Sequence, residues 1–384
     1  MDILYVTKTS PLADGGGGEE RARQVTEGLA SRGHSVRILC GKTAEELPKR
    51  TTFEGCTVRH VACVPSFVFR FSLLSFYATR YLFAITSLPV VLWVLWTRDV
   101  DVVVENMTPY ASLTVALASL SRTPIVAVQH EFYDHSCYET YDPITATIQL
   151  LVQNILRTGK YDRVIVPTTH VARRLAEYGI DDSTLAVVPN GVDVDKYVRR
   201  GVNRDPKALV TVGRLSKRKG QDTVLRAFET VQEQVRDVHL HVVGDGPARE
   251  PLESLADELG IRESVTFHGF VTERRKIELL NRSSVFVFAS RQEGFGLVLL
   301  EAMAANLPVV ATALPVYRDF FGNEQRGRLL GTRDTDEFAA AVSEFLTDVE
   351  RSKTASTVNR RTAEEFSWDS TVVRTEQLLA EVVS

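Results

Sequence analysis

The sequence has little of several features that mark particular protein classes. Its formal net charge is only −4 over 384 residues, so it lacks the basic field by which proteins bind nucleic acids. Its four cysteines show no C-x-x-C spacing, which argues against a zinc site and against a disulfide framework. We find no internal repeat and no low-complexity tract. The composition, with 44% hydrophobic and 24% charged residues, fits an α/β protein with reduced thiols, and we expect it to be cytoplasmic.

The sequence also lacks a basic, apolar leader, because residues 1–7 are typical of a first β-strand and not of a secretion signal. One segment, residues 67–96, is unusually rich in aromatic and apolar side chains. It carries no charge from Tyr81 to Thr97 but is slightly short for a spanning helix, and Pro89 interrupts it. A core helix of the first domain and a helix in a membrane interface are the two main interpretations, with a spanning helix third. The interfacial interpretation would make the protein peripheral on a membrane.

Alternating strand and helix patterns predict parallel sheets covered on both faces. Because 384 residues exceed what one core usually serves, we expect two domains. We place the first at residues 1–188 and the second at residues 189–368, and expect a last helix in residues 369–384 to pack back on the first. The predicted strands are Ile3–Val6, Val36–Leu39, Val102–Glu105, Ile125–Gln129 and Arg163–Pro167, then Ala208–Val212, His239–Val243, Val265–Phe267, Val285–Phe288 and Val309–Ala311.

The most informative segment runs from Glu293 to Glu301. It follows an apolar run predicted as a buried strand and passes through the loop Gly294–Gly296 into a helical pattern. The loop amides would lie at a helix N-terminus, a place suited to anions and sugar oxygens. Glu301 falls among apolar helix residues, where a carboxylate is costly unless donors such as ribose hydroxyls reach it. The plain alternative is a buried glutamate bonded to neighbouring backbone.

Two further loops follow predicted strands. The loop at residues 213–220 carries Arg214, which can clamp a phosphate with two hydrogen bonds, and Lys219, which adds a point charge. Four glycines at residues 15–18 let the backbone approach a ligand closely. This run lacks the G-x-G-x-x-G spacing of dinucleotide enzymes and the lysine of a P-loop. The plain alternatives are a solvated basic turn and a flexible turn.

Together these segments resemble the motifs of the retaining glycosyltransferases of family 4, with their Glu-x7-Glu signature and Gly-Arg-Leu-x-x-x-Lys-Gly loop. The resemblance covers nearly the whole chain. It implies the GT-B fold, an α/β fold of two Rossmann-like, doubly wound domains with a cleft between them. It implies transfer of a hexose-type sugar from a nucleotide diphosphate sugar to the hydroxyl of a glycan or lipid-linked acceptor. It implies no cofactor and no metal, and a donor phosphate oxygen that accepts the proton of the acceptor.

The resemblance also assigns roles to residues. Arg214 and Lys219 would stabilise the diphosphate leaving group, and Glu293 would hold the sugar hydroxyls. His130, which follows a first-domain strand, matches a histidine near the donor sugar, and Glu131 is an alternative group there for shaping acceptor binding. Lys217 and Arg218 are expected to be surface charges. Donor contacts are expected from Gly16, Gly17, Gly18, Gly244, Gly269, Phe270, Gly294, Phe295, Gly296 and Glu301.

The chain departs from the family pattern at two places. Asn306 stands where a glycine is common, and residues 312–317 replace a loop that usually has paired glycines, which puts base or sugar contacts from that loop in doubt. The three Asp-x-Asp triplets are too short to indicate a metal site. Two other functions stay open, namely a nucleotide-sugar epimerase of the same fold and a non-catalytic protein that binds sugar nucleotides.

Overall fold

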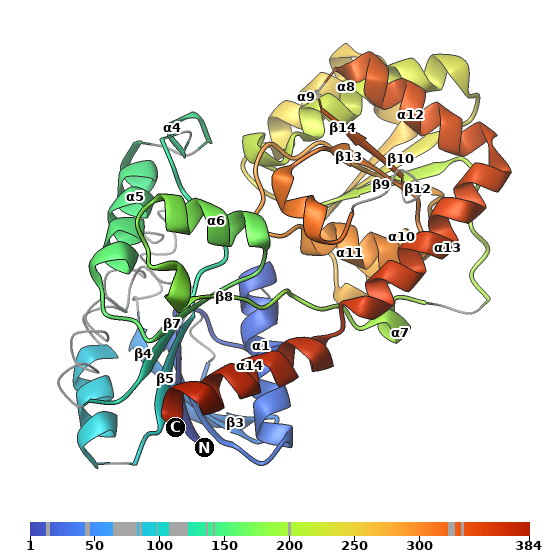
Figure 1. The fold of residues 1–384 in the computed structure, drawn as a ribbon. Helices are drawn as coiled ribbons and strands as arrows, with labels where there is room; N and C mark the ends of the chain where they lie inside the picture. The colour runs from blue at the N-terminus through green and yellow to red at the C-terminus, as the bar shows by residue number, and fades with distance from the viewer. Residues whose placement is uncertain are drawn as a thin grey trace. The chain divides into compact units, whose positions relative to one another are not determined.

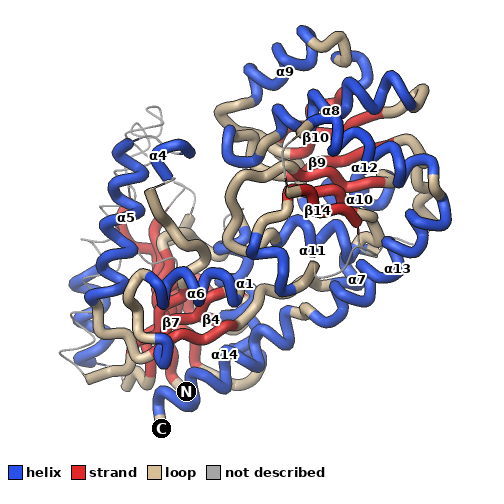
Figure 2. Tube along the Cα trace, turned by 45° about the horizontal axis from the view of Figure 1, so that its top comes forward, coloured by secondary structure: helices blue, strands red, loops and turns tan. Residues whose placement is uncertain are grey.

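The computed structural model describes residues 1–12, 16–42, 47–63, 83, 87–97, 99–106, 122–135, 137–140, 143–198, 201–321, 327–331 and 334–384 (Figures 1 and 2). These residues form two compact units. Unit 1 comprises residues 1–191 with 368–384, and unit 2 comprises residues 192–367. Each unit contains one sheet whose strands are mainly parallel, which confirms the predicted α/β class with two Rossmann-like halves.

Unit 1 is built on an eight-stranded sheet in the order β3-β4-β2-β1-β5-β6-β7-β8. All its neighbouring strands are parallel except β3 and β4, which pair antiparallel. The five strands predicted for the first domain are confirmed, whereas β3, β4 and β8 were not predicted. The strands are β1 (Asp2–Thr7), β2 (Ser35–Lys42), β3 (Arg50–Phe53), β4 (Cys56–Cys63), β5 (Val102–Asn106), β6 (Ile125–Val128), β7 (Arg163–Val166) and β8 (Leu185–Val187).

Two helices from opposite ends of the chain pack together on unit 1 (Figure 1). A β-carbon on Gly28 of α1 would lie 2.4 Å from Val372 of α14, so only glycine allows this close contact. Leu378 and Leu379 of α14 join the core formed by β1, β2 and β5. Residues 112–121, whose sequence pattern is also helical, lie outside the described residues. The described helices are α1 (Gly17–Ser31), α4 (Cys137–Thr140), α5 (Pro143–Thr158), α6 (Thr169–Glu177) and α14 (Trp368–Val383), with residues 87–97 also helical.

Unit 2 is built on a six-stranded parallel sheet in the order β11-β10-β9-β12-β13-β14. Its central strands are continuous runs of buried apolar residues, as is usual for parallel sheets covered on both faces. The five predicted strands are confirmed, and β14 is an additional edge strand. The strands are β9 (Ala208–Val212), β10 (His239–Val243), β11 (Val265–Gly269), β12 (Val285–Phe288), β13 (Val309–Thr312) and β14 (Gly327–Leu330).

The helices of unit 2 cover both faces of this sheet (Figure 2). One layer contains α8 with its neighbours α9 and α12, and α11 packs instead against α7 and α13. One core cluster of unit 2 contains Phe228, Phe338 and Phe345 between α8, α12 and the strands. The helices are α7 (Val194–Tyr197), α8 (Gln221–Gln234), α9 (Arg249–Glu258), α10 (Glu273–Arg282), α11 (Leu297–Ala304), α12 (Thr335–Thr347) and α13 (Val349–Glu365).

Each sheet has a point where the direction of strand addition reverses. In unit 1 the chain adds β2 on one side of β1 and later adds β5 on the other side. In unit 2 it adds β10 and β11 on one side of β9, and then β12 on the other. Open α/β sheets bind ligands beyond the carboxyl ends of the strands at such a switch point. The loops that follow β1, β5, β9 and β12 are therefore the places to look for a site.

Candidate functional site

The loop after β9 is shaped by glycines that no other residue can replace without strain. Gly220 ends a short 3₁₀ turn, Lys217–Lys219, in the left-handed region with φ of 65°, and begins α8. A β-carbon on Gly220 would lie 2.0 Å from the carbonyl oxygen of Ala289, which follows β12. The two loops that flank the switch point of unit 2 are thus in contact through this glycine.

An ion pair joins the same two loops. The ammonium of Lys219 binds Oε1 of Glu293, and Ser290 Oγ donates to that oxygen at 2.8 Å. Burial alone would raise the pKa of Glu293, but the charges of Lys219 and Arg218 outweigh burial, so the pKa is lowered. The Lys219 ammonium also lies 5.4 Å from the centre of the Phe288 ring. Two residues predicted to be catalytic are therefore held together, in an ionised pair, at the switch point.

The other cations of this loop differ in their surroundings. Arg214 is exposed, and its guanidinium forms no ion pair with any residue that the structure describes. Lys217 is exposed, as expected for a surface charge. The same expectation is wrong for Arg218, which is half-buried and close enough to lower the pKa of Glu293. An anion that reached this loop would meet the exposed guanidinium of Arg214 and the ammonium of Lys219, which Glu293 already binds.

Glu301 lies in a second buried cluster of charges. Lys276 of α10 donates to Glu301 Oε2 at 2.8 Å and to Glu273 Oε2 at 2.9 Å. Tyr197 of α7 donates its hydroxyl to Glu273 Oε1 at 2.8 Å, and its ring lies 5.5 Å from the Lys276 ammonium. Burial, together with the charge of Glu273, raises the pKa of Glu301, although Lys276 opposes the shift. Lys276 was not predicted, because a lysine three residues after a glutamate in a helix usually indicates a surface pair.

The remaining glycine loops of unit 2 line the same edge of the sheet. Gly244, with φ of 130°, leaves space for the Gly213 carbonyl, which a β-carbon would approach to 2.0 Å. The amide of Gly244 donates to the carbonyl of Gly269 at 2.9 Å, so the loops after β10 and β11 are joined. Phe270, the next residue, is 68% exposed, an unusual placement for a phenylalanine without a ligand or partner.

The loop before α11 presents backbone and not side chains. Gly296 caps the helix in the left-handed region with φ of 94°, and a β-carbon there would lie 2.5 Å from the ring of Tyr317. Phe295 is 4% exposed and packs on Phe320 with ring centres 5.1 Å apart. Any contact of Phe295 with a ligand would therefore use its amide. The buried Tyr317 comes from the segment that departs from the family pattern, and here it supports the loop from behind.

At the switch point of unit 1, His130 Nε2 lies 2.9 Å from Oδ1 of Asn106, the last residue of β5. The amide nitrogen of Asn106 also lies 3.4 Å from the carbonyl oxygen of Gly18. Burial, together with the positive charges of Arg21 and Lys8, lowers the pKa of His130 to about 3, so this imidazole is neutral near pH 7. The alternative group, Glu131, is 8% exposed. The glycine loop and His130 are thus connected through Asn106.

The glycine loop itself is engaged by an acid. The amide of Gly16, the N-cap of α1, donates to Oε2 of Glu19 at 3.0 Å, and Thr9 donates to Oε1 of Glu19 at 3.2 Å. Gly17 and Gly18 begin the helix. The fully buried Arg21 of the same helix donates to the carbonyl of Val188 at 2.8 Å and to the side chain of Asn190 at 2.7 Å. Arg21 was not predicted, since its partners are more than 160 residues away in sequence.

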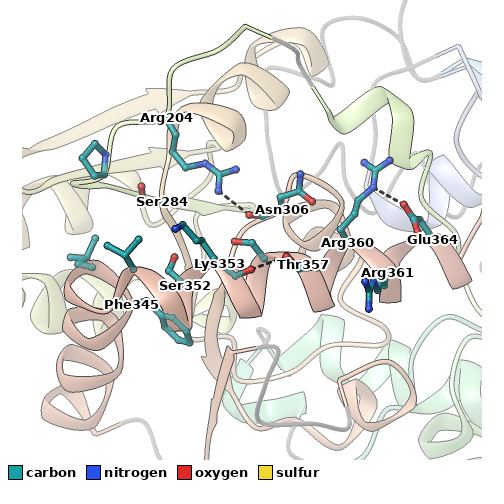
Figure 3. A pocket seen from close by; sticks show the side chains of 14 residues that line it. Arg204, Ser284, Asn306, Phe345, Ser352, Lys353, Thr357, Arg360, Arg361 and Glu364 are labelled. Carbon is teal, nitrogen blue, oxygen red and sulfur yellow. Dashed lines mark hydrogen bonds and ion pairs between the residues drawn. The ribbon is translucent and has the colours of Figure 1, made fainter.

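A separate cavity of about 760 Å³ lies at the amino ends of β9, β12 and β13, at the opposite edge of the sheet (Figure 3). Two of the three arginines that line it, Arg204 and Arg360, are engaged in the fold. Arg204 donates to the carbonyls of Ala305 and Asn306 at 2.9 Å, and Arg360 donates to that of Ala304 at 3.3 Å. They cap the C-terminus of α11, where cations are favourable. Arg204 and Arg360 thus have a structural role in capping α11.

Three further observations bear on the predictions. Residues 67–82 and 84–86 of the apolar segment lie outside the described residues, but its helical part exposes Trp93 (46%) and Trp96 (75%). No helix among the described residues is long and apolar enough to cross a membrane. Nor do three or more His, Cys, Asp or Glu side chains of the described part of the chain gather where they would hold a metal ion.

Comparison with known proteins gives matches over both units. Residues 15–196 match the family model described as Glycosyltransferase Family 4, and residues 195–362 match that of Glycosyl transferases group 1. An uncharacterised glycosyltransferase of Methanocaldococcus jannaschii is 26% identical over 388 residues, covering 96% of this chain and 95% of that protein. A D-inositol 3-phosphate glycosyltransferase of Geodermatophilus obscurus is 36% identical over 230 residues, which span 55% of this chain and half of that protein.

Solved structures show the same fold. The Anabaena protein HepE, determined with UDP and glucose, superposes with a TM-score of 0.78 at 19% identity, covering 99% of this chain and 100% of that one. WaaG, a glycosyltransferase involved in lipopolysaccharide biosynthesis, superposes with a TM-score of 0.74 at 19% identity, covering 98% of this chain and 99% of that one. Two matched family models, one over each unit, and two loops that carry the Glu-x7-Glu and Arg/Lys motifs at a switch point lead to one conclusion: this chain belongs to the family 4, group 1 glycosyltransferases of GT-B fold.

Proposed function

We propose that this protein is a retaining, metal-independent glycosyltransferase that moves a hexose-type sugar from a nucleotide diphosphate sugar to an acceptor hydroxyl. The observation that carries the proposal is the ion pair of Lys219 with Glu293 at the switch point of unit 2, beside the exposed Arg214. This arrangement puts cations where a diphosphate leaving group would develop charge, and a carboxylate where sugar hydroxyls would need an acceptor. The UDP bound by the similar Anabaena structure supports a nucleotide sugar as donor.

In this proposal the three charged residues have different roles. Lys219 would donate both to Glu293 and to the diphosphate, because an ammonium has three protons to share. Arg214 is free to swing onto a phosphate oxygen and clamp it with two hydrogen bonds. Glu293, whose pKa is lowered, stays ionised near neutral pH and accepts hydrogen bonds from sugar hydroxyls. As the bond to the leaving group breaks, both cations stabilise the added negative charge more than they stabilise the bound donor.

His130 of unit 1, which the family resemblance places near the donor sugar, is polar but uncharged. The neutral His130 donates from Nε2 to Asn106, which leaves Nδ1 as an acceptor for a sugar hydroxyl. No side chain need act as a base if a phosphate oxygen of the donor takes the proton of the acceptor, as the family resemblance implies. His130 would then orient the donor sugar without titrating in the physiological range.

For the acceptor we propose a lipid-linked or glycan hydroxyl, with the protein bound peripherally to a membrane. Trp93 and Trp96, on the helical part of the apolar segment, and Ile144 (57% exposed) and Leu151 (58%), on α5, are large apolar side chains on the surface of unit 1. Exposed tryptophans next to arginine suit the depth of lipid headgroups, and Arg59 lies 5.6 Å from the Trp93 ring.

The deciding experiment incubates the protein with UDP-glucose, UDP-N-acetylglucosamine or GDP-mannose, with and without candidate acceptors. Acceptor-dependent release of the nucleoside diphosphate, with the anomeric configuration of the donor kept in the product, is the expected result. An epimerised donor with no diphosphate release would instead reveal an isomerase. Binding without any turnover in the presence of lipid-linked and free glycan acceptors would indicate a non-catalytic protein.

A further inference from the structure

A nucleotide places its ribose between its base and its diphosphate, and unit 2 contains a charged cluster at the matching position. The family resemblance places Gly269 and Phe270 beside the base. Gly269 ends β11, and Phe270 begins the loop that leads into α10, whose first residue is Glu273. Glu293 binds Lys219, the residue expected beside the diphosphate, and leads into α11, which carries Glu301. Lys276 bridges Glu273 and Glu301. It therefore lies where the base side and the diphosphate side of the site meet.

We propose that Lys276 is a positioning residue for the ribose of the bound nucleotide and acts through Glu301, whose carboxylate it orients and keeps ionised for hydrogen bonds from the two ribose hydroxyls. The inference rests on the proposed function, since it takes Glu301 as the ribose-binding residue. Lys276 itself need not touch the ligand. Its ammonium occupies one lone-pair direction of Oε2, and a carboxylate offers about four such directions, so acceptors remain for a diol.

Burial makes this contact necessary. The side chains of Glu301 and Lys276 are only 12% and 16% exposed, so water does little to stabilise either charge. An isolated carboxylate in such a place takes up a proton, and a protonated carboxyl then donates from one oxygen and accepts less well at the other. Glu273 lies on the far side of the same ammonium and competes for it. Lys276 therefore sets the charge of Glu301, and Glu273 works against it.

Other charged groups on the packed elements are engaged elsewhere. On α7, Lys196 reaches Glu273 at 3.2 Å, and Tyr197, a neutral donor, hydrogen-bonds Glu273 and also lowers the pKa of Glu301. On α13, which packs on both α7 and α11, Arg360 binds Asp195, Glu364 and the carbonyls of Val194 and Ala304. None of these groups supplies a cation to Glu301 among the described residues. Lys276 is the cation that contacts it there.

The direction of the pH effect follows. Affinity for the ribose diol is lost as the pH falls through the pKa of Glu301, because protonation removes acceptor sites. Removing the Lys276 charge raises that pKa and moves the loss to higher pH. Removing the Glu273 charge lowers the pKa and moves the loss to lower pH. The two substitutions on one helix thus shift the same property in opposite directions, which a general loss of structure would not do.

The test measures calorimetric affinity for UDP and for 2′-deoxy-UDP between pH 5 and 9 in the wild type, K276M, K276R and E273Q. The phosphates of the two nucleotides take up protons over the same pH range. The ratio of the two affinities therefore reports only the contribution of the ribose diol. We expect a ratio of about tenfold in the wild type at neutral pH, as one charge-assisted hydrogen bond allows. The pH at which half of this ratio is lost should be lowest in E273Q, intermediate in the wild type and highest in K276M. K276R should resemble the wild type.

Several outcomes would overturn the inference. One is that K276M loses half of the affinity ratio at the same pH as the wild type. Another is that K276M loses affinity equally for both nucleotides. K207M, which breaks the exposed Lys207–Asp237 pair of the same unit, is the matched control and should leave the ratio unchanged. If K276M does not fold, the midpoint of E273Q decides alone. If the wild type does not distinguish the two nucleotides, or binds neither UDP, GDP nor ADP, then the ribose assignment of Glu301 or the donor class itself is wrong, and the inference falls with it.

Discussion

The ammonium of Lys219 binds the buried carboxylate of Glu293, and by this contact the loop after β9 is fastened to the loop after β12. Glycine at position 220 makes the contact possible, because a side chain there would collide with the carbonyl of Ala289. The pair is polar, nearly enclosed and placed at a switch point, a combination more typical of a working site than of a structural bridge.

Replacing the cations of the β9 loop should therefore reduce catalysis. We expect Arg214→Ala and Lys219→Ala each to lower kcat by about a hundredfold or more, as the loss of a group that stabilises charge in the transition state commonly does. Lys217→Ala is the matched control in the same loop and should stay close to wild type. Steady-state kinetics with a donor and its acceptor measure this. Equal sensitivity of Lys217 and Lys219 would show that the loop has been assigned in the wrong register.

The two glutamates should separate binding from turnover. Glu301→Ala should weaken binding of the nucleoside diphosphate, because Glu301 is expected to hold the ribose and lies in the cluster with Lys276. Glu293→Ala should mainly lower kcat, since it is expected to hold the sugar. Calorimetric titration and single-turnover kinetics distinguish the two effects. Unchanged nucleotide affinity in the Glu301 variant would refute its ribose role.

Chelation should leave activity intact. Arg214 and Lys219 supply positive charge where a divalent cation would otherwise neutralise a diphosphate. The assay compares initial rates before and after dialysis against EDTA, with magnesium or manganese added back to one sample. A rate that falls in EDTA and recovers with either metal would contradict metal independence.

The packing of α14 on α1 should depend on the absence of a side chain at position 28. Gly28→Val would place methyl groups inside Val372 and should lower the free energy of unfolding by about 1–3 kcal/mol, the usual cost of overpacking. Ser31→Val, on the exposed side of the same helix, serves as the control and should change stability by less than about 0.5 kcal/mol. Urea unfolding measures both. If adding Val372→Ala to Gly28→Val restores none of the lost stability, the contact with Val372 is not the cause of the loss.

The membrane proposal predicts co-sedimentation with vesicles of phosphatidylcholine and phosphatidylglycerol at low salt. Burial of two exposed indoles adds transfer free energy at roughly 25 cal/mol per Å². A double variant, Trp93→Ser with Trp96→Ser, should stay in the supernatant and keep its melting temperature within a few degrees. A wild type that ignores these vesicles would favour an acceptor that is not embedded in a lipid surface.

Sequence patterns predicted those parts of the fold that depend on local, periodic signals. Each strand with an uninterrupted apolar run was found, and β9, β10 and β12 match residue for residue. Three of the four missed strands, β3, β8 and β14, lie at sheet edges, whereas β4 lies inside the sheet of unit 1. Among the edge strands, β3 alternates exposed and half-buried positions in Arg-Thr-Thr-Phe, and β8 has no fully buried residue. Edge strands bury little, so their sequences carry little apolar signal.

The candidate site was predicted in its motifs but not in its partnerships. The sequence indicates Glu293 and Lys219 separately, whereas their contact depends on β9 and β12 becoming neighbours. Lys276 and Arg21 gave no signal, because a single lysine or arginine in a helix is ordinary until the fold shows what it is buried against. Phe295 was expected to help bind the donor, and its side chain belongs to the core instead.

The order in which the two units are completed during synthesis follows from the position of α14. Residues 1–191 leave the ribosome first, yet the core they form includes Val372, Leu378 and Leu379, which are translated only after all of unit 2. At about 5–20 residues per second, the first sheet waits roughly 10–35 s with its apolar surface beside α1 uncovered. Unit 2, by contrast, can close its core as soon as its own residues are made. The half that is translated first is thus finished last, and it is the half for which a chaperone would matter most.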